Sequence, residues 1–174
     1  MGRASTERGE LAPRVGRSIL ELPGVVAAAV PAVITVAAWR LGHRPHPARP
    51  HQPRFWLAAV LAVIGLTLGI ATMSLFATTG RGTLAPWDPP EALVVKGPYR
   101  YVRNPMISGI MFLLAAEAAY LRSAGIAAWL AAFFAANSVW FPLVEEKGLE
   151  ARFGADYLEY KANVARWLPR LRPW

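Results

Sequence analysis

Residues 55–76 read FWLAAVLAVIGLTLGIATMSLF, a stretch of 22 residues without a charged side chain. A helix needs roughly 20 apolar residues to cross a bilayer core of about 30 Å. Three further apolar stretches, at 22–39, 106–121 and 126–144, approach that length. The sequence therefore predicts an all-α integral membrane protein with about four transmembrane helices.

Two residues that are unusual in a membrane helix, a proline and a glutamate, are compatible with this prediction. The first stretch contains Pro31 and the third contains Glu117, and such residues are tolerated where neighbouring helices satisfy them. Glu117 is either a functional intramembrane acid or a structural partner of Arg122. Because only residues 122–125 separate the last two stretches, we expect those helices to form an antiparallel hairpin.

Composition and charge narrow the class of protein. The 174 residues are 55% hydrophobic and contain no cysteine, which excludes disulfides, thiolate catalysis and cysteine-ligated metals.

Of the 19 lysines and arginines, 14 lie in the N-terminal segment, in the 78–104 loop and in the tail from Glu145. The positive-inside rule places these segments in the cytoplasm. The bases form no single stripe, so nucleic-acid binding is not expected. A cleaved signal peptide is the competing interpretation of residues 1–40.

The segment KGPYRYVRNP (96–105) places bases and aromatic rings just before the third apolar stretch. Asparagine favours the N-cap and proline the first helical position, so a helix should begin at Asn104-Pro105. Its free N–H groups and positive dipole end suit a carboxylate or phosphate. Side chains that can add to such a site, or serve only as interfacial anchors, are Tyr99, Arg100, Tyr101 and Arg103.

A second cluster, EEKGLEARFGADYLEYKANVARW (145–167), follows the fourth apolar stretch. Helical spacing predicts an amphipathic C-terminal helix with one aromatic and apolar face. That face comprises Glu145, Leu149, Phe153, Tyr157, Tyr160 and Val164. Glu146 should point about 100° away, toward water. The predicted hairpin would bring Glu145 close to Asn104.

S-adenosylmethionine has a group for each part of this arrangement. Its carboxylate suits a helix end or an arginine, its sulfonium suits a carboxylate or an aromatic ring, and its adenine suits an apolar slot. A nucleotide or an anionic lipid headgroup would use several of the same groups, so these alternatives stay open.

Two blocks, LVVKGPYRYVRNPMISG (93–109) and VEEKGLEARFGADYLEYKANVARWLPRL (144–171), resemble the C-terminal part of the isoprenylcysteine carboxyl methyltransferases. They also resemble the bacterial and phospholipid methyltransferase relatives of those enzymes. The resemblance implies an integral membrane enzyme that binds S-adenosylmethionine on its cytoplasmic side and admits a lipophilic acceptor from the bilayer. It implies cofactor contacts at Leu93, Val94, Tyr99, Asn104, Pro105, Met106, Ile107 and Glu145. It implies no metal, and no catalytic residue is assigned.

The chain departs from this family in ways that bear on the substrate. The usual Arg-His-Pro-x-Tyr is here Arg103-Asn104-Pro105-Met106-Ile107, which replaces a titratable ring by an amide and loses the tyrosine. Phe141 stands where the prenylcysteine enzymes carry an arginine for the substrate carboxylate, so prenylcysteine is not the expected acceptor. A carboxyl, an amine or a hydroxyl remains possible as the methylated group.

These inferences give one membrane domain over residues 1–174. It would consist of a cytoplasmic N-terminal segment (1–21), two helices (22–76) and a methyltransferase-like cofactor-binding core (77–171). The expected partners are a lipid bilayer and a lipophilic substrate, and the expected location is a bacterial inner membrane. The sequence is silent on oligomeric state. Two alternatives remain: a nicotinamide-dependent reductase resembling the sterol reductases, whose C-terminal block is similar, and a non-catalytic lipid-binding membrane protein.

Overall fold

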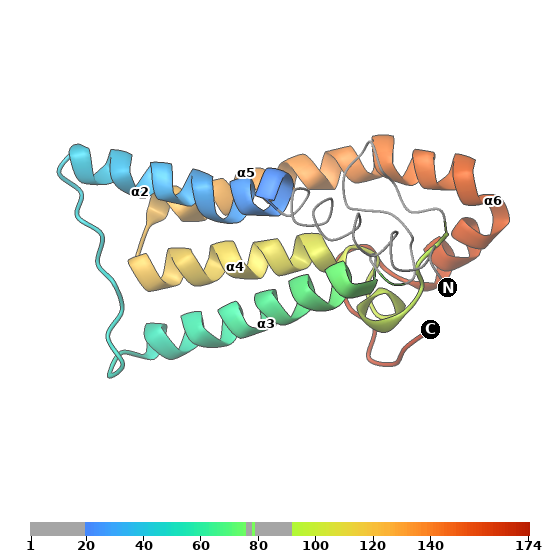
Figure 1. Ribbon diagram of the computed structural model, residues 1–174, viewed down its shortest axis with the longest axis horizontal. Helices are drawn as coiled ribbons and strands as arrows, with labels where there is room; N and C mark the ends of the chain where they lie inside the picture. The colour runs from blue at the N-terminus through green and yellow to red at the C-terminus, as the bar shows by residue number, and fades with distance from the viewer. Residues whose placement is uncertain (1–19, 76–77, 79–91) are drawn as a thin grey trace, which may run out of the picture.

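The computed structural model describes residues 20–75, 78 and 92–174, and every regular element in that part of the chain is helical (Figure 1). The predicted all-α class is confirmed for these residues. The elements are η1 (Leu20–Ala29), α2 (Val30–Arg40), α3 (Pro53–Leu75), η3 (Gly97–Arg100), α4 (Pro105–Leu121), α5 (Ala124–Trp140), η4 (Phe141–Glu145) and α6 (Glu146–Asn163).

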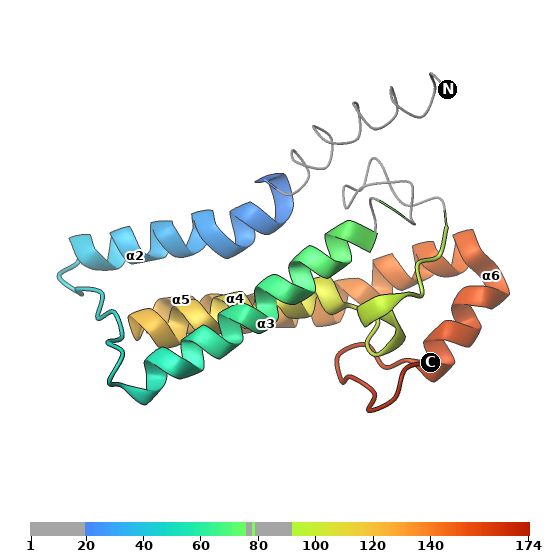
Figure 2. The same cartoon turned by 60° about the horizontal axis from the view of Figure 1, so that its bottom comes forward.

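The helices α2, α3, α4 and α5 run alongside one another, whereas α6 extends beyond the end of α5 (Figures 1 and 2). Within residues 20–75 and 92–174, two helical segments are long and apolar enough to cross a membrane, Pro53–Leu75 and Ala124–Asn163. Two shorter apolar helices, Gly24–Arg40 and Pro105–Leu121, accompany them. At 1.5 Å per residue, the 17 residues of α4 span about 26 Å, slightly less than a bilayer core.

Helices α3 and α4 approach each other closely where two glycines face each other. A Cβ atom built on Gly65 would lie 2.8 Å from the carbonyl oxygen of Gly109, and one on Gly109 would lie 3.0 Å from that of Gly65. Small residues at a helix interface allow such backbone contact, which is a common way to associate helices in lipid. Any side chain at Gly65 would therefore separate α3 from α4.

The hairpin between α4 and α5 forms as predicted. Arg122 adopts the left-handed conformation at the end of α4 (φ 52°), and the Ser123 hydroxyl caps α5 by accepting from the Ile126 N–H at 3.2 Å. Behind this turn, Ile110, Leu114 and Ile126 form a buried cluster. The hairpin thus places the start of α4 and the end of α5 at the same end of the bundle.

Helix α4 begins at Pro105, as predicted, but Asn104 does not cap it with its side chain. Its backbone carbonyl instead accepts from the N–H and from the hydroxyl of Ser108, both at 3.0 Å. The asparagine amide is consequently left for other partners.

The connection from α2 to α3 is extended and tied to the far end of α4. The N–H groups of His46 and Ala48 donate to the carbonyls of Leu121 and Tyr120, at 3.2 and 2.8 Å. The Arg54 guanidinium donates to the carbonyl of His46 at 2.8 Å. These bonds hold the α2–α3 connection at the end of the bundle where α4 ends and α5 begins.

Helix α6 has the aromatic face that the sequence predicts, with a bend at Gly154 (φ 53°, ψ −126°). Tyr157, Tyr160 and Val164 are buried, and Leu149 and Phe153 pack against them. The bend returns the chain toward the bundle, as Figure 1 shows at the end opposite the α2–α3 connection. The final residues therefore run back past η3 and the start of α4.

Candidate functional site

The segment before α4 is held against α6. Leu93 and Val95 pack on the buried cluster of Tyr157, Tyr160 and Val164. The Tyr160 hydroxyl donates to the backbone carbonyl of Tyr99 at 2.7 Å. The first predicted cluster therefore lies on the aromatic face of the second.

The irregular C-terminal residues run beside the same segment through backbone hydrogen bonds. The N–H of Arg103 donates to the carbonyl of Ala165 at 2.9 Å, and the N–H of Arg170 donates to that of Tyr101 at 2.9 Å. The segment before α4 therefore meets a later part of the chain at the start of α4. The parts that meet are η3 with its flanks, α6, and the tail that follows Asn163.

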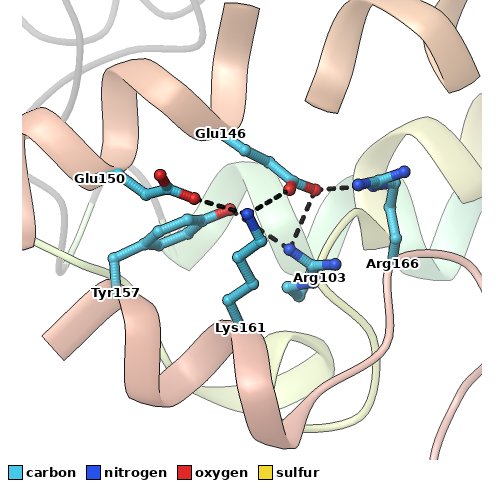
Figure 3. Close-up of polar contacts among 6 residues, drawn as sticks. All are labelled: Arg103, Glu146, Glu150, Tyr157, Lys161 and Arg166. Atoms are coloured by element: carbon cyan, nitrogen blue, oxygen red, sulfur yellow. Dashed lines mark hydrogen bonds and ion pairs between the residues drawn. The ribbon is translucent and has the colours of Figure 1, made fainter. Parts of the chain in front are cut away.

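At this meeting point the Glu146 carboxylate is surrounded by three cations (Figure 3). One of its oxygens (Oε1) lies 2.6 Å from Nε of Arg166 and 2.9 Å from Nη1 of Arg103. The other (Oε2) lies 3.2 Å from Nζ of Lys161, which also contacts Glu150 at 2.5 Å. Glu146 is only 2% exposed. Its carboxylate fixes Arg103 at the entrance to α4.

The predicted orientation of the two glutamates is wrong, because Glu146 is buried and Glu145 is exposed. Two interruptions of regular helix account for the difference. In η4 the Glu146 N–H donates to the Phe141 carbonyl five residues earlier, one more than in an α-helix, which turns the faces of α6 relative to α5. The bend at Gly154 then breaks the single straight face of the prediction and returns Lys161 and Arg166 to Glu146.

The pKa values of the Glu145 and Glu146 carboxylates are shifted in opposite directions. Burial alone would raise the pKa of Glu146, but the hydrogen bond from Arg166 and the charge of Arg103 outweigh burial and lower it. For Glu145, loss of hydration beside apolar groups raises the pKa, and the charge of Arg152 opposes that rise only in part. Although Glu145 reaches solvent, its carboxylate is less completely compensated than that of Glu146.

The phenol of Tyr99 also has a shifted pKa. Burial is the main cause of its raised pKa, and the neighbouring Tyr160 and Glu145 raise it further. The influence of Glu145 on Tyr99 places the two side chains in one electrostatic environment. The phenol therefore stays protonated at neutral pH and can donate a hydrogen bond.

Two neighbouring donors at the start of α4 are buried without a partner. They are Nε of Arg103 and Nδ2 of Asn104. The start of α4 adds its first N–H groups, which have no partner within the helix. An unpaired buried donor costs about 1–3 kcal/mol, so two adjacent ones indicate a place for an anionic or acceptor group of a ligand.

The other expected contact residues lie near this point but differ in exposure. Val94 and Pro105 are buried, and Leu93 and Met106 are half-buried. Ile107 packs against the Ile110 cluster between α4 and α5, so it belongs to the helix interface. The structure brings Tyr99, Asn104 and Glu145 to one end of the bundle; whether they contact a cofactor stays a prediction.

The sequence did not indicate the role of Glu146 or of its partners Lys161 and Arg166. Their convergence depends on the wide turn of η4, on the bend at Gly154 and on the return of the tail. Pro142 and Gly154, both inside an otherwise helical stretch, were the signals in the sequence that regular helical spacing would fail.

Comparison with known proteins identifies the family of this chain. The model of the phospholipid methyltransferase family matches residues 53–156. The chain belongs to the phospholipid methyltransferase family. This match confirms the resemblance seen in the sequence and covers α3, α4, α5 and α6 to just past its bend. No curated protein and no solved structure matches the chain.

The phospholipid methyltransferase family is a family of membrane methyltransferases, and the apolar helices of this chain agree with that membership. The matched residues include the α4 start and both glutamates, but not Lys161 and Arg166, which complete the ion-pair cluster. The part of the site contributed by the tail is therefore outside the family match.

Proposed function

We propose that the protein is an S-adenosylmethionine-dependent methyltransferase that acts on a lipophilic acceptor taken from the bilayer. Family membership supports methyl transfer, and such families act on lipids. The observation that carries the proposal is the pair of buried, unpartnered donors on Arg103 and Asn104 at the start of α4. A membrane helix start with no anionic ligand would have no need of them.

The α-carboxylate of the methyl donor would bind these two donors and the first N–H groups of α4. Arg103 is held for this purpose by Glu146, whose carboxylate lies 2.9 Å from Nη1 and leaves Nε available. Asn104 contributes an amide in place of the histidine expected at this position. A hydrogen bond to a carboxylate is what an asparagine amide can still supply.

Glu145 and Tyr99 would lie on the sulfonium side. An incompletely compensated carboxylate attracts a cationic sulfur, and a tyrosine ring can face it. Leu93, Val94 and Met106 would supply apolar surface for the adenine, while Pro105 and Ile107 would shape the helix start. When bound, S-adenosylmethionine supplies an electrophilic methyl group, and positioning accounts for most of the catalysis.

The acceptor decides whether a base is needed. A carboxylate can be methylated directly, whereas an amine or a hydroxyl must lose a proton. Tyr99 is a poor base because its raised pKa keeps it protonated, and its ionised form would be rare. Glu145 has a raised pKa and is the better base of the two, since a less acidic carboxylate holds a proton more readily.

Ligand-dependent thermal stabilisation of the detergent-purified protein tests this proposal. S-adenosylhomocysteine should raise the unfolding midpoint, since a ligand at 100 times its Kd stabilises by about 2.7 kcal/mol. NADPH should leave the midpoint unchanged. Stabilisation by NADPH and not by S-adenosylhomocysteine would favour the reductase alternative, and no effect of either would favour a non-catalytic protein.

Incubation of lipid extracts with a labelled methyl donor, followed by mass spectrometry, would then identify the acceptor. Label should appear in an extractable lipophilic product and depend on the protein. If label appeared only in water-soluble products, the lipophilic acceptor would be excluded while the methyl transfer itself would stand.

A further inference from the structure

The tail ARWLPRLRPW (165–174) has an unusual composition for a segment without regular structure. It contains three arginines, two tryptophans and two leucines, and no acidic residue. Its backbone is nevertheless fixed, because it hydrogen-bonds to Arg100, Tyr101 and Arg103. The tail is thus an ordered surface presented at the start of α4.

Ring contacts place this tail at the depth of the membrane boundary. The Trp167 ring lies 5.7 Å from that of Phe134 and 5.8 Å from that of Phe141. Phe134 lies seven residues, or about 10 Å, inside α5 from Phe141. Because α5 is part of a segment long and apolar enough to cross a membrane, these contacts place Trp167 beside the apolar part of that segment.

Two leucines of the tail face outward at this level. Leu168 is 78% exposed and Leu171 is fully exposed, although Trp167 beside them is packed against α5. Leucines that project from a fixed backbone next to membrane helices would lie among lipid rather than water. Exposed apolar side chains beside tryptophans are typical of segments that lie in the membrane interface.

The arginines of the tail differ in how far they are already engaged. Arg166 pairs with Glu146, and Nη1 of Arg170 donates to the Asn163 carbonyl at 2.5 Å. Arg172 is exposed beside Leu171. The tail has no acidic side chain, and among the described residues no carboxylate pairs with Arg170 or Arg172, so these two arginines present positive charge next to the exposed leucines.

We propose that residues 165–174 form an interfacial segment that inserts Leu168 and Leu171 into the adjacent leaflet and binds anionic phospholipid headgroups through Arg170 and Arg172. The leucines would contribute buried apolar area, and the arginines would contribute attraction to lipid phosphate. The segment would fix the start of α4 at the bilayer surface. It does not depend on which ligand occupies the candidate cofactor site.

Site-specific fluorescence tests the insertion. The chain has no cysteine, so Leu171→Cys provides a single labelling site at a fully exposed position. An environment-sensitive dye at this position should emit at shorter wavelength and be quenched by spin-labelled phosphatidylcholine in nanodiscs. The control is Asp156→Cys, an exposed position just past the bend of α6, where the dye should behave as in water. Equal, water-like emission at both positions would overturn the proposal.

The same label tests the headgroup preference. At equal mole fraction, spin-labelled phosphatidylglycerol should quench the dye at position 171 more strongly than spin-labelled phosphatidylcholine. Arg172→Gln should reduce this anionic preference by up to about five-fold, the contribution of one arginine near an anionic surface. Arg44→Gln, the same charge change at the opposite end of the molecule, should leave it unchanged. Equal quenching by both lipids in the wild-type background would overturn the role of the arginines.

These outcomes are separable from those of the methyltransferase proposal. Quenching reports where the tail lies, and thermal stabilisation by S-adenosylhomocysteine reports cofactor binding. Loss of the lipid preference with intact cofactor binding would reject the interfacial segment alone, and the reverse result would reject the cofactor site alone.

Discussion

Glu146 joins all three parts of the candidate site. Its carboxylate contacts Arg103 before α4, Lys161 on α6 and Arg166 in the tail. A buried carboxylate with several cations holds the chain in one arrangement, and loss of that carboxylate leaves buried positive charge unpaired. Glu145, one residue earlier, is exposed and has no comparable structural task.

We therefore expect Glu146→Gln to lower the free energy of unfolding by about 3 kcal/mol, at the lower end for a broken buried ion pair because Lys161 and Arg166 are partly exposed. Glu145→Gln is the matched control and should change that free energy by less than about 0.5 kcal/mol. Denaturant titration in detergent measures both. A larger loss from Glu145→Gln would contradict the assignment of the structural role.

The pH dependence of stability should follow the same carboxylate. Because folding lowers the pKa of Glu146, its stabilisation is present above the unfolded-state value of about 4.3 and is lost as pH falls through the lowered value. The wild-type protein should lose this contribution only in strong acid. Glu146→Gln should lack that acid-dependent loss, since glutamine does not titrate.

At the scale of helices, α3 and α4 depend on the contact between Gly65 and Gly109. A methyl group at Gly65 would meet the Gly109 carbonyl oxygen and Leu113 at 2.8 Å, whereas one at Gly69 would meet nothing within 4 Å. The two glycines are one helical turn apart in the same helix, so they form a matched pair. Because their surroundings differ, alanine substitutions at Gly65 and Gly69 distinguish the effect of packing from the effect of helix propensity.

Gly65→Ala should therefore destabilise the protein by about 1–3 kcal/mol, the usual cost of overpacking. Gly69→Ala should be neutral or stabilising by up to about 1 kcal/mol, because alanine favours a helix over glycine. Unfolding in a detergent titration distinguishes the two variants. Equal effects would mean that α3 and α4 are not in backbone contact at Gly65.

The elements also show what the sequence could predict. Apolar length located the helices, the Asn104-Pro105 pair located the start of α4, and residues 122–125 located the hairpin turn. These features are local, so a single chain contains enough information for them. The orientation of Glu145 and Glu146 was not predictable from 3.6-residue spacing, because that spacing assumes one straight helix, whereas the chain has a wide turn in η4 and a bend at Gly154 that returns the partners of Glu146.

In the molecule as a whole, the candidate site forms because the chain folds back on itself, and no single sequence motif contains it. The bend at Gly154 and the tail bring Lys161, Ala165 and Arg166 back to the start of α4. The hydrogen bond between Arg103 and Ala165 joins residues about 60 positions apart, and none of these contacts has a local sequence pattern. The proximity of the α4 start to the acidic end of the fourth apolar stretch was predicted correctly, although the acid that makes the contact is Glu146.

The central claim is that the start of α4 binds the carboxylate end of a methyl donor through Arg103 and Asn104. Calorimetric titration of two ligands tests it: S-adenosylhomocysteine, which has the amino-acid group, and 5′-methylthioadenosine, which lacks it. Asn104→Ala should weaken S-adenosylhomocysteine binding by about ten-fold or more, as expected for a lost hydrogen bond to a charged group, and leave 5′-methylthioadenosine unchanged. Asn137→Ala is the control, since its Nδ2 already donates to the Phe133 carbonyl within α5. Unchanged affinity for S-adenosylhomocysteine, or equal loss of both ligands in Asn104→Ala, would contradict the claim.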